Sequence, residues 1–352
     1  MNKKRTTLKD IANVLNISTA AVSKALNDDA RISIKTKKAV KQVAEELNYQ
    51  PNHLASALRK GKSNLVGVIV PRTNSNFFSS VVENMEEVLN KAGYNIIITQ
   101  SNESFEKECK NIDALLYTQV DGIIASMANE TVDLSYYEKI KSKGIPLILF
   151  DRGENDLNVD YVGIDDYQSS HMIVDHLVGQ GCKRIAHIGG FRRTRIFNNR
   201  IRGYVDAIKK HKLPTEDELL IESGLTLDDG RLQIEKLLAL KNRPDAVYVA
   251  SDYAALGALQ VLKEKNIKVP QDIKLVGFGN EPFTSLVTPS ITSVSQHSAQ
   301  IGRLAAETFL SYIEKEVVKQ TLNKIILESQ LIVRDSSKLK SVIVNNDNAF
   351  DI

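Results

Sequence analysis

The chain has 352 residues, of which 42% are hydrophobic, so it can hold two or three domains with a substantial core. Its start, MNKKRTTLKD, leads into no apolar run and no apolar stretch of 18 residues follows, which excludes a signal peptide and a membrane span as readings of the sequence. The net charge is only +3, but residues 1–62 contain 13 Lys and Arg against 5 Asp and Glu. We therefore expect a cytoplasmic protein whose N-terminal part binds a polyanion.

The two cysteines, Cys109 and Cys182, lie far apart in predicted helices or helix ends. We interpret them as reduced core or boundary residues rather than as a disulfide or a metal pair. The six histidines are scattered, and the sequence has no phosphate-binding loop, nucleophile elbow or metal-ligand spacing. We expect no metal, no cofactor and no enzyme.

Three short helices are predicted near the N-terminus. Thr7 and Asp10 resemble a weak capping box, and the apolar residues that follow repeat at helical spacing. The helices are expected to begin after Thr7, Ser18 and Ser33 and to span about 8–15, 19–26 and 34–47. Two short helices joined by a tight turn, with a third in support, form a helix-turn-helix.

The second of these helices exposes small or hydrogen-bonding side chains, as a helix that enters the major groove must. Thr19 and Ala20 lie at its N-terminal end and are the candidates for base contact, Ala20 only through its methyl group. The other candidates for DNA contact, most of them to phosphates, are Thr7, Ser18, Ser23, Lys24, Asn27 and Arg31. The alternative is a three-helix bundle with an ordinary solvated face.

The stretch YQPNHLASALRKGK, residues 49–62, joins this basic module to the rest of the chain. Pro51 ends the preceding helix, because proline lacks the backbone N–H and disfavours helical geometry before it. Asn52 can then cap a short helix over His53–Arg59. Such a short helix is marginal alone in water, so the stretch is either a plain linker or a helix that forms with a partner.

Beyond residue 64, short apolar runs alternate with amphipathic segments of helical length. This alternation predicts an α/β fold with parallel sheets covered on both faces. The expected strands are 65–70, 94–100, 122–126, 146–150, 184–188, 246–250, 275–278, 291–295 and a closing strand near 331–333. The expected helices are 78–92, 104–118, 167–179, 199–210, 228–240, 253–265 and 299–314. The pattern restarts after Asp165, which favours a second lobe but leaves one domain or two open.

Ligands of such sheets bind beyond the carboxyl ends of the strands, so the loops there hold the candidate ligand-binding residues. Phe77 and Phe78 can stack on a ligand or pack into the lobe. Asp151 can accept hydrogen bonds from ligand hydroxyls or form a salt bridge with Arg152. The remaining candidates in these loops include Ser126 and Ser251, whereas Asp252 is expected to cap the next helix.

One loop, GGFRRTRIFNNR at 189–200, is unusually basic. Arg192, Arg193 and Arg195 would attract an acidic or phosphorylated ligand if they faced the site. The alternative reading is a solvated loop.

The segments TLKDIANVLNISTAAVSKALN, ELNYQPNHLASALR and GVIVP together resemble the lactose-repressor (LacI/GalR) family of bacterial transcription regulators. The resemblance continues through Phe150-Asp151-Arg152, Ala250-Ser251-Asp252 and LIVRDS at 331–336, and so covers nearly the whole chain. It implies a helix-turn-helix domain (1–50), a hinge (51–63), a core of two periplasmic-binding-protein-like lobes and a flexible tail (337–352). The lobes would comprise about 64–164 with 294–324 and about 165–293 with 325–336, and the chain would cross between them three times.

The resemblance also assigns roles to single residues. Residues 49–62 become a hinge helix that pairs with its twin, with Leu58 inserted between base steps from the minor groove. The other hinge residues expected at the DNA are Asn52, His53, Ala55 and Arg59. Arg200, three residues before Gly203, matches the family's ligand-contacting arginine. The family's ligand-binding aspartate is Gly279 here, so Asn280 or Glu281 would have to replace it.

We therefore expect a homodimeric, sequence-specific transcription regulator, in the first instance a repressor, on a near-palindromic double-stranded DNA operator. Its effector would be a small molecule, a sugar or sugar derivative, bound between the lobes. The alternatives are a regulator controlled by a protein partner or a non-sugar effector, and a binding protein without DNA function. The tail has no leucine heptads, so no coiled-coil tetramer is expected.

Overall fold

The computed structural model describes residues 6–49, 62–314 and 322–338. The chain divides into two compact units, Met1–Ser63 and Asn64–Ile352. Most of the expected hinge and tail, residues 51–61 and 339–352, lies outside the described residues, so those expectations stay predictions. Among the described residues, no helix is long and apolar enough to cross a lipid bilayer.

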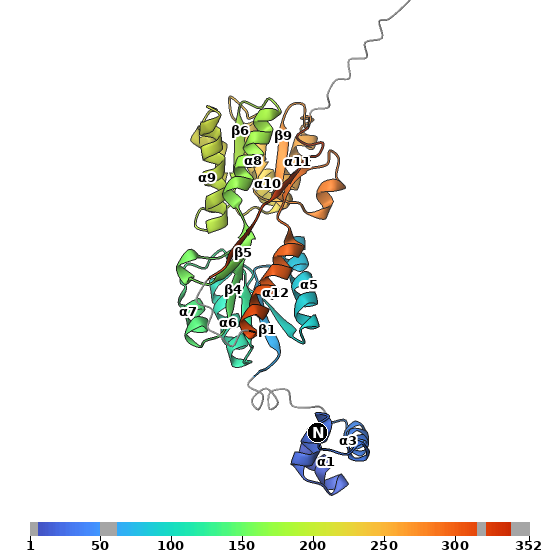
Figure 1. Ribbon diagram of the computed structural model, residues 1–352. Helices are drawn as coiled ribbons and strands as arrows, with labels where there is room; N and C mark the ends of the chain where they lie inside the picture. The colour runs from blue at the N-terminus through green and yellow to red at the C-terminus, as the bar shows by residue number, and fades with distance from the viewer. Residues whose placement is uncertain (1–5, 50–61, 315–321, 339–352) are drawn as a thin grey trace, which may run out of the picture. The chain divides into compact units, whose positions relative to one another are not determined.

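The N-terminal unit consists of helices at the positions that the sequence predicts, α1 (Leu8–Leu15), α2 (Thr19–Leu26) and α3 (Ile34–Glu46) (Figure 1). Their apolar faces meet in one small core, which contains Ile11, Ala12, Val22, Ala25, Val40, Val43 and Ala44. The Asp10 carboxylate accepts hydrogen bonds of 2.7 Å from the Thr7 N–H and hydroxyl, which fixes the start of α1. The hydroxyls of Ser18 and Ser33 cap α2 and α3.

The larger unit contains two six-stranded sheets, one in each lobe (Figure 1). The first sheet is entirely parallel, in the order β11-β5-β4-β3-β1-β2. Its strands are β1 (Leu65–Val70), β2 (Asn95–Gln100), β3 (Gly122–Ala125), β4 (Leu147–Phe150), β5 (Asp160–Ile164) and β11 (Lys324–Leu327). Two helices cover each face: α5 (Asn76–Lys91) with α12 (Ser298–Glu314), and α6 (Phe105–Tyr117) with α7 (Ser135–Ser142).

Successive residues of a strand point to opposite faces, so β1 supplies both cores of this lobe. Val66 and Val68 pack toward α5 and α12, whereas Ile69 packs toward α6 and α7. Such burial on both faces explains why the central strands are continuous apolar runs.

The second sheet has the order β12-β10-β9-β8-β6-β7. Its strands are β6 (Ile185–Gly189), β7 (Leu220–Glu222), β8 (Ala246–Val249), β9 (Lys274–Gly279), β10 (Thr292–Ser295) and β12 (Gln330–Ile332). The helices α8 (Asp166–Gly179) and α9 (Arg195–Lys210) cover one face, and α10 (Leu227–Leu238) and α11 (Asp252–Glu264) cover the other. The α/β class and the two lobes agree with the prediction, except that β12 runs antiparallel to β10.

Strand pairing corrects the expected lobe boundaries. The chain crosses from the first sheet to the second after Ile164, back after Ser295, and again after Leu327. β10 therefore belongs wholly to the second lobe and β11 to the first, so these two crossings fall a few residues after the approximate boundaries expected near 293 and 324.

Three strands, β5, β7 and β11, are absent from the sequence prediction. β7 has only three residues, and β11 is a half-exposed edge strand. β5 reads DYVGI, in which Asp160 and Gly163 interrupt the apolar run although every residue is buried. Pairing with a neighbouring strand, which no local pattern reveals, establishes all three.

Candidate functional site

In the N-terminal unit, the expected recognition surface lies on α2. Thr19 and Ala20 are exposed at its first turn, while Val22 and Ala25 are buried beneath them. Lys24 is exposed on the same helix. This arrangement leaves the predicted base-contacting pair free to approach a groove.

Several predicted phosphate contacts also have structural partners. The Thr7 hydroxyl donates to Asp10, and the Asn27 side chain donates to the Ser23 carbonyl oxygen at 2.7 Å. The Arg31 guanidinium donates two hydrogen bonds, of 3.0 and 2.7 Å, to the Asp29 carboxylate. These bonds hold the pKa of the Asp29 carboxyl well below its usual range. The hinge candidates Asn52, His53, Ala55, Leu58 and Arg59 lie outside the described residues.

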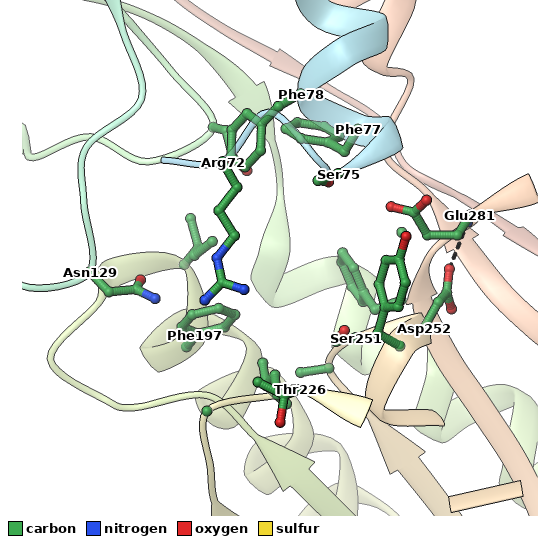
Figure 2. Close-up of a pocket in the computed structure, with 18 of the residues that line it drawn as sticks. Arg72, Ser75, Phe77, Phe78, Asn129, Phe197, Thr226, Ser251, Asp252 and Glu281 are labelled. Atoms are coloured by element: carbon green, nitrogen blue, oxygen red, sulfur yellow. Dashed lines mark hydrogen bonds between the residues drawn. The ribbon is translucent and has the colours of Figure 1, made fainter. Parts of the chain in front are cut away.

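In the larger unit, a cavity of about 330 Å³ lies between the two lobes (Figure 2). Both lobes contribute to it, through loops at the carboxyl ends of the strands and the first turns of the following helices. Its polar lining includes Arg72, Ser75, Glu103, Asn129, Asp151, Arg152, Arg200, Thr226, Ser251, Asp252, Glu281 and Gln296. Its aromatic lining consists of Phe77, Phe78, Phe197, Tyr253 and Phe278.

Phe77 and Phe78 pack into the first lobe and also border the cavity. Both line the cavity, and both are more than nine-tenths buried in the first lobe. Their ring centroids lie 5.1 Å apart in an edge-to-face contact, so each ring fixes the orientation of the other. Phe197 offers a further ring from the other lobe (Figure 2).

Asp151 is a cavity carboxylate with an unusual backbone. Its φ of 56° lies in the left-handed region, and its carbonyl oxygen accepts a 2.7 Å hydrogen bond from the Tyr161 hydroxyl. Burial raises the pKa of the Asp151 carboxyl to about 6. Ser126 donates to this carboxyl at 3.5 Å and does not line the cavity, so its expected ligand contact stays a prediction.

Arg152 pairs mainly with Glu103 rather than with Asp151. Its Nη1 lies 2.6 Å from Glu103 Oε2, whereas its Nε lies 3.8 Å from Asp151 Oδ2. Arg72 contacts the other oxygen of Glu103, with Nε 3.3 Å from Oε1. Two arginines thus share one carboxylate, and they hold the pKa of Glu103 below its usual value despite its burial.

Arg200 also lines the cavity, but much of its guanidinium has partners. Its Nε lies 2.7 Å from Asp166 Oδ1, and its Nη1 donates to the Ala250 carbonyl oxygen at 3.2 Å. The guanidinium carbon stacks 3.6 Å from the centroid of the Phe278 ring. These contacts orient the arginine rigidly at the edge of the cavity.

Asp252 is a cavity residue rather than a helix cap, which corrects the expectation for it. Ser251 holds the N-cap position of α11, and Asp252 is the first helical residue. The Asp252 carboxylate accepts hydrogen bonds from the Ser293 hydroxyl at 2.7 Å and from the Glu281 N–H at 2.8 Å. Burial raises the pKa of the Asp252 carboxyl to about 6.

Asn280 is not part of the cavity lining, and its expected ligand contact stays a prediction. Its side-chain oxygen accepts a 2.7 Å hydrogen bond from Arg334, which ties it to the segment after β12. The neighbouring Glu281 does line the cavity, from the second lobe (Figure 2).

The three loop arginines do not line this cavity. Arg192 pairs with Glu222 at 2.8 Å, and Arg193 lies over the exposed Phe191 ring. Arg195 reaches across to the first lobe, where it donates to the Gly153 carbonyl oxygen at 3.2 Å. These three arginines are therefore surface or interlobe residues, and their charges lie outside the lining of this cavity.

Sequence reasoning missed a part of the lining, which comprises Arg72, Glu103, Asn129, Phe197, Thr226, Tyr253 and Gln296. Thr226 follows β7, so recognising that short strand would have found it by the rule used for the other loops. Glu103 follows β2 by three residues, so the same rule would have found it, whereas its pairing with Arg152 is visible only in the fold.

Comparison with known proteins agrees with this architecture. Residues 7–52 match the family model "Bacterial regulatory proteins, lacI family", and residues 174–337 match "Periplasmic binding protein-like domain". Catabolite control protein A of Priestia megaterium is 31% identical over 333 residues, which cover 94% of this chain and 99% of that protein.

The chain belongs to the lacI family. The structure of the lac repressor dimer bound to operator and the anti-inducer ONPF has the same fold, with a TM-score of 0.83 at 22% identity over 95% of this chain and 99% of that one. The transcriptional regulator CelR in complex with cellobiose is 26% identical with a TM-score of 0.71, covering 94% of this chain and all of that one.

Family membership confirms three of the predictions from sequence. As a member of this family, the protein is a DNA-binding transcription regulator with a small-molecule effector. Its relatives are regulators rather than enzymes. The helix-turn-helix and the two-lobed core supply the two parts that such a regulator needs.

Proposed function

We propose that this regulator is a cytoplasmic homodimeric repressor that binds a near-palindromic operator and responds to a neutral sugar. The observation that carries the effector class is the lining of the interlobe cavity, in which aromatic rings stand beside buried carboxylates. Aromatic faces suit the apolar face of a sugar ring, and carboxylates accept hydrogen bonds from its hydroxyl groups.

The charges in the cavity favour a neutral ligand over an anionic one. Glu103 balances one of the two charges of Arg72 and Arg152, and Asp166 balances Arg200. The additional carboxylates of the lining, Asp151, Asp252 and Glu281, then leave no excess of positive charge for a phosphate or carboxylate of the ligand. The CelR–cellobiose complex supports the same class, because cellobiose is a neutral sugar.

The DNA-binding part of the proposal rests on α2 and on the hinge. Two copies of α2, one from each subunit, would read two half-sites with Thr19 and Ala20, and Lys24 would contact phosphate. From the family resemblance, Leu58 of the hinge would insert between base steps from the minor groove, with Arg59 on the flanking phosphates.

A ligand screen on the full-length chain tests the effector class. Neutral mono- and disaccharides, uronic acids, sugar phosphates and nucleobases are compared by thermal shift and then by calorimetry. A neutral sugar at 100 times its Kd is expected to add about 2.7 kcal/mol of stability and to change operator affinity in a gel-shift titration. Selective binding of an acidic sugar, a sugar phosphate or a nucleobase would overturn the proposal.

The control for the screen is a variant that keeps the fold and removes one acceptor. Asp151→Asn is nearly isosteric, and its carboxyl is already easily protonated in the folded state. Sugar affinity is expected to fall about 10-fold or more, which corresponds to one lost charge-assisted hydrogen bond.

A further inference from the structure

The first turn of α5 faces the interlobe cavity, and its backbone amides need partners from outside the helix. The first four N–H groups of any α-helix have no acceptor within the helix. Ser75, the N-cap residue of α5, makes no capping hydrogen bond with its own side chain. The amides of Asn76 and Phe77 would therefore form an anion-binding position at the wall of the cavity.

The acceptor for these groups comes from the other lobe. Burial raises the pKa of the Glu281 carboxyl, and the backbone N–H groups of Phe77 and Asn76 and the Ser75 side chain act against this rise. Glu281 is 7% exposed, and in Figure 2 its carboxyl points toward Ser75 at the start of the helix. A buried carboxyl from a loop of the second lobe thus faces the uncapped start of a helix of the first lobe.

The backbone of Glu281 is held as firmly as its side chain. Its N–H donates to Asp252 at 2.8 Å, and its carbonyl oxygen accepts a 2.7 Å hydrogen bond from the Thr284 hydroxyl. Gly279, two residues earlier, has a φ of +127°, a value that residues with a side chain rarely adopt. This conformation directs the chain so that residue 281 reaches the first lobe.

We propose that Glu281 is a specificity-determining residue, which fills the anion position at the start of α5 and thereby links the lobes and keeps anionic effector groups out. The proposal rests on the proposed function only in taking this cavity as the effector site. A carboxylate or phosphate of a ligand could bind the α5 amides only by displacing Glu281, and displacement would separate the lobes at this point. A neutral sugar leaves the contact intact.

A second interlobe contact, at the other side of the cavity, provides a matched comparison. The Thr194 hydroxyl donates to the Asn129 side-chain oxygen at 3.1 Å, also from the second lobe to the first. It involves no helix amides and no carboxylate. Thr194→Val therefore removes an interlobe hydrogen bond without creating an anion position.

Anion rescue tests the proposal on the full-length chain. Hydrogen–deuterium exchange is followed by mass spectrometry for peptides that cover residues 74–79, in wild type, Glu281→Ala, Glu281→Gln and Thr194→Val. Exchange at Asn76 and Phe77 is expected to rise about 10–100-fold in Glu281→Ala, as for loss of a hydrogen bond to a charged group. Formate or acetate should restore slow exchange in this variant, and chloride at the same ionic strength should not.

The other variants should not respond to formate. In Glu281→Gln the side-chain amide still occupies the position at the start of α5, so exchange at Asn76 and Phe77 should lie between that of wild type and that of Glu281→Ala. If Glu281→Ala does not fold, the comparison of Glu281→Gln with wild type tests the proposal. Wild-type exchange rates in both Glu281 variants, or no formate effect in a folded Glu281→Ala, would overturn the proposal. Rescue by formate without binding of any neutral sugar would instead refute the proposed effector class and leave the role of Glu281 standing.

Discussion

Arg200 Nε lies 2.7 Å from Asp166 Oδ1, with both side chains about 95% buried. The pair joins α9 to the first residue of α8, both in the second lobe. Burial raises the pKa of the Asp166 carboxyl even though Arg200 opposes the shift. The arginine that the family resemblance assigns to the ligand therefore also neutralises a buried carboxylate of its own lobe.

Arg200→Ala is expected to destabilise the core as well as weaken effector binding. Removing one partner leaves the Asp166 charge buried and unpaired, at a cost of about 3–5 kcal/mol. Chemical denaturation of the full-length chain, followed by far-UV circular dichroism, measures the loss.

The matched control is Arg192→Ala, which breaks a more exposed ion pair between the loop before α9 and Glu222 of β7. That pair should contribute no more than about 1 kcal/mol. Equal losses of unfolding free energy in the two variants would show that the buried Arg200–Asp166 pair contributes no more to stability than the exposed pair. The double variant Arg200→Met with Asp166→Leu should recover much of the stability, because no lone charge remains buried.

The two buried cavity acids predict a pH dependence of stability. The pKa values of Asp151 and Asp252 rise from 3.8 to about 6 on folding. The folded state then binds more protons than the unfolded state between about pH 4 and 6, so this contribution to stability falls as pH rises through that window and is level above it. Each acid should account for about 1–3 kcal/mol.

The difference in unfolding free energy between wild type and Asp151→Asn reports the titration of Asp151 alone, because all other titrating groups are shared by the two proteins. Unfolding free energies measured from pH 4 to 7.5 should show the variant gaining relative to wild type as pH rises to about 6. A constant difference across this range would mean that the Asp151 carboxyl keeps its ordinary pKa in the folded chain.

Sequence patterns located most of the fold because burial on both faces leaves a strong signal. β1 is an uninterrupted apolar run, and its predicted bounds are those observed. β11 gives no such signal, since it is an edge strand whose side chains alternate between exposed and half-buried. Its place beside β5 depends on a chain crossing that local sequence does not encode.

Cavity residues could be predicted from the sequence where their place depends only on following a strand. They could not be predicted where the direction of the side chain depends on a distant partner. Asp151 follows β4 directly and Ser251 follows β8 after one residue, and both line the cavity as expected. Asn280 follows a strand too, but Arg334 holds its side chain away from the cavity. Such a partner, 54 residues further along the chain, is visible only in the folded structure.

The exposed start of α2 predicts separable effects on operator choice and operator affinity. Exchanging Thr19 and Ala20 for other small residues should change which operator a binding-site selection recovers, because base contacts carry the sequence information. Lys24→Ala should weaken binding to all operators alike and reduce the salt dependence by about one counterion. Equal losses on every sequence in the Thr19/Ala20 variants would place those residues at phosphates instead.

Restoring the family's aspartate at position 279 should harm the protein rather than improve its effector site. The φ of +127° would strain any residue with a side chain, at a cost of about 1–3 kcal/mol. A Cβ at Gly279 would also lie 3.3 Å from Asp252 Oδ2, so the new carboxylate would crowd an existing one. Denaturation of Gly279→Asp and Gly279→Ala separates backbone strain from charge repulsion. Both variants have the strained backbone, but only the aspartate variant adds repulsion with Asp252. This repulsion should weaken as pH falls below about 6, where Asp252 becomes protonated. A Gly279→Asp variant as stable as wild type, with tighter sugar binding, would show that the loop relaxes and that Glu281 does not depend on the glycine for its position.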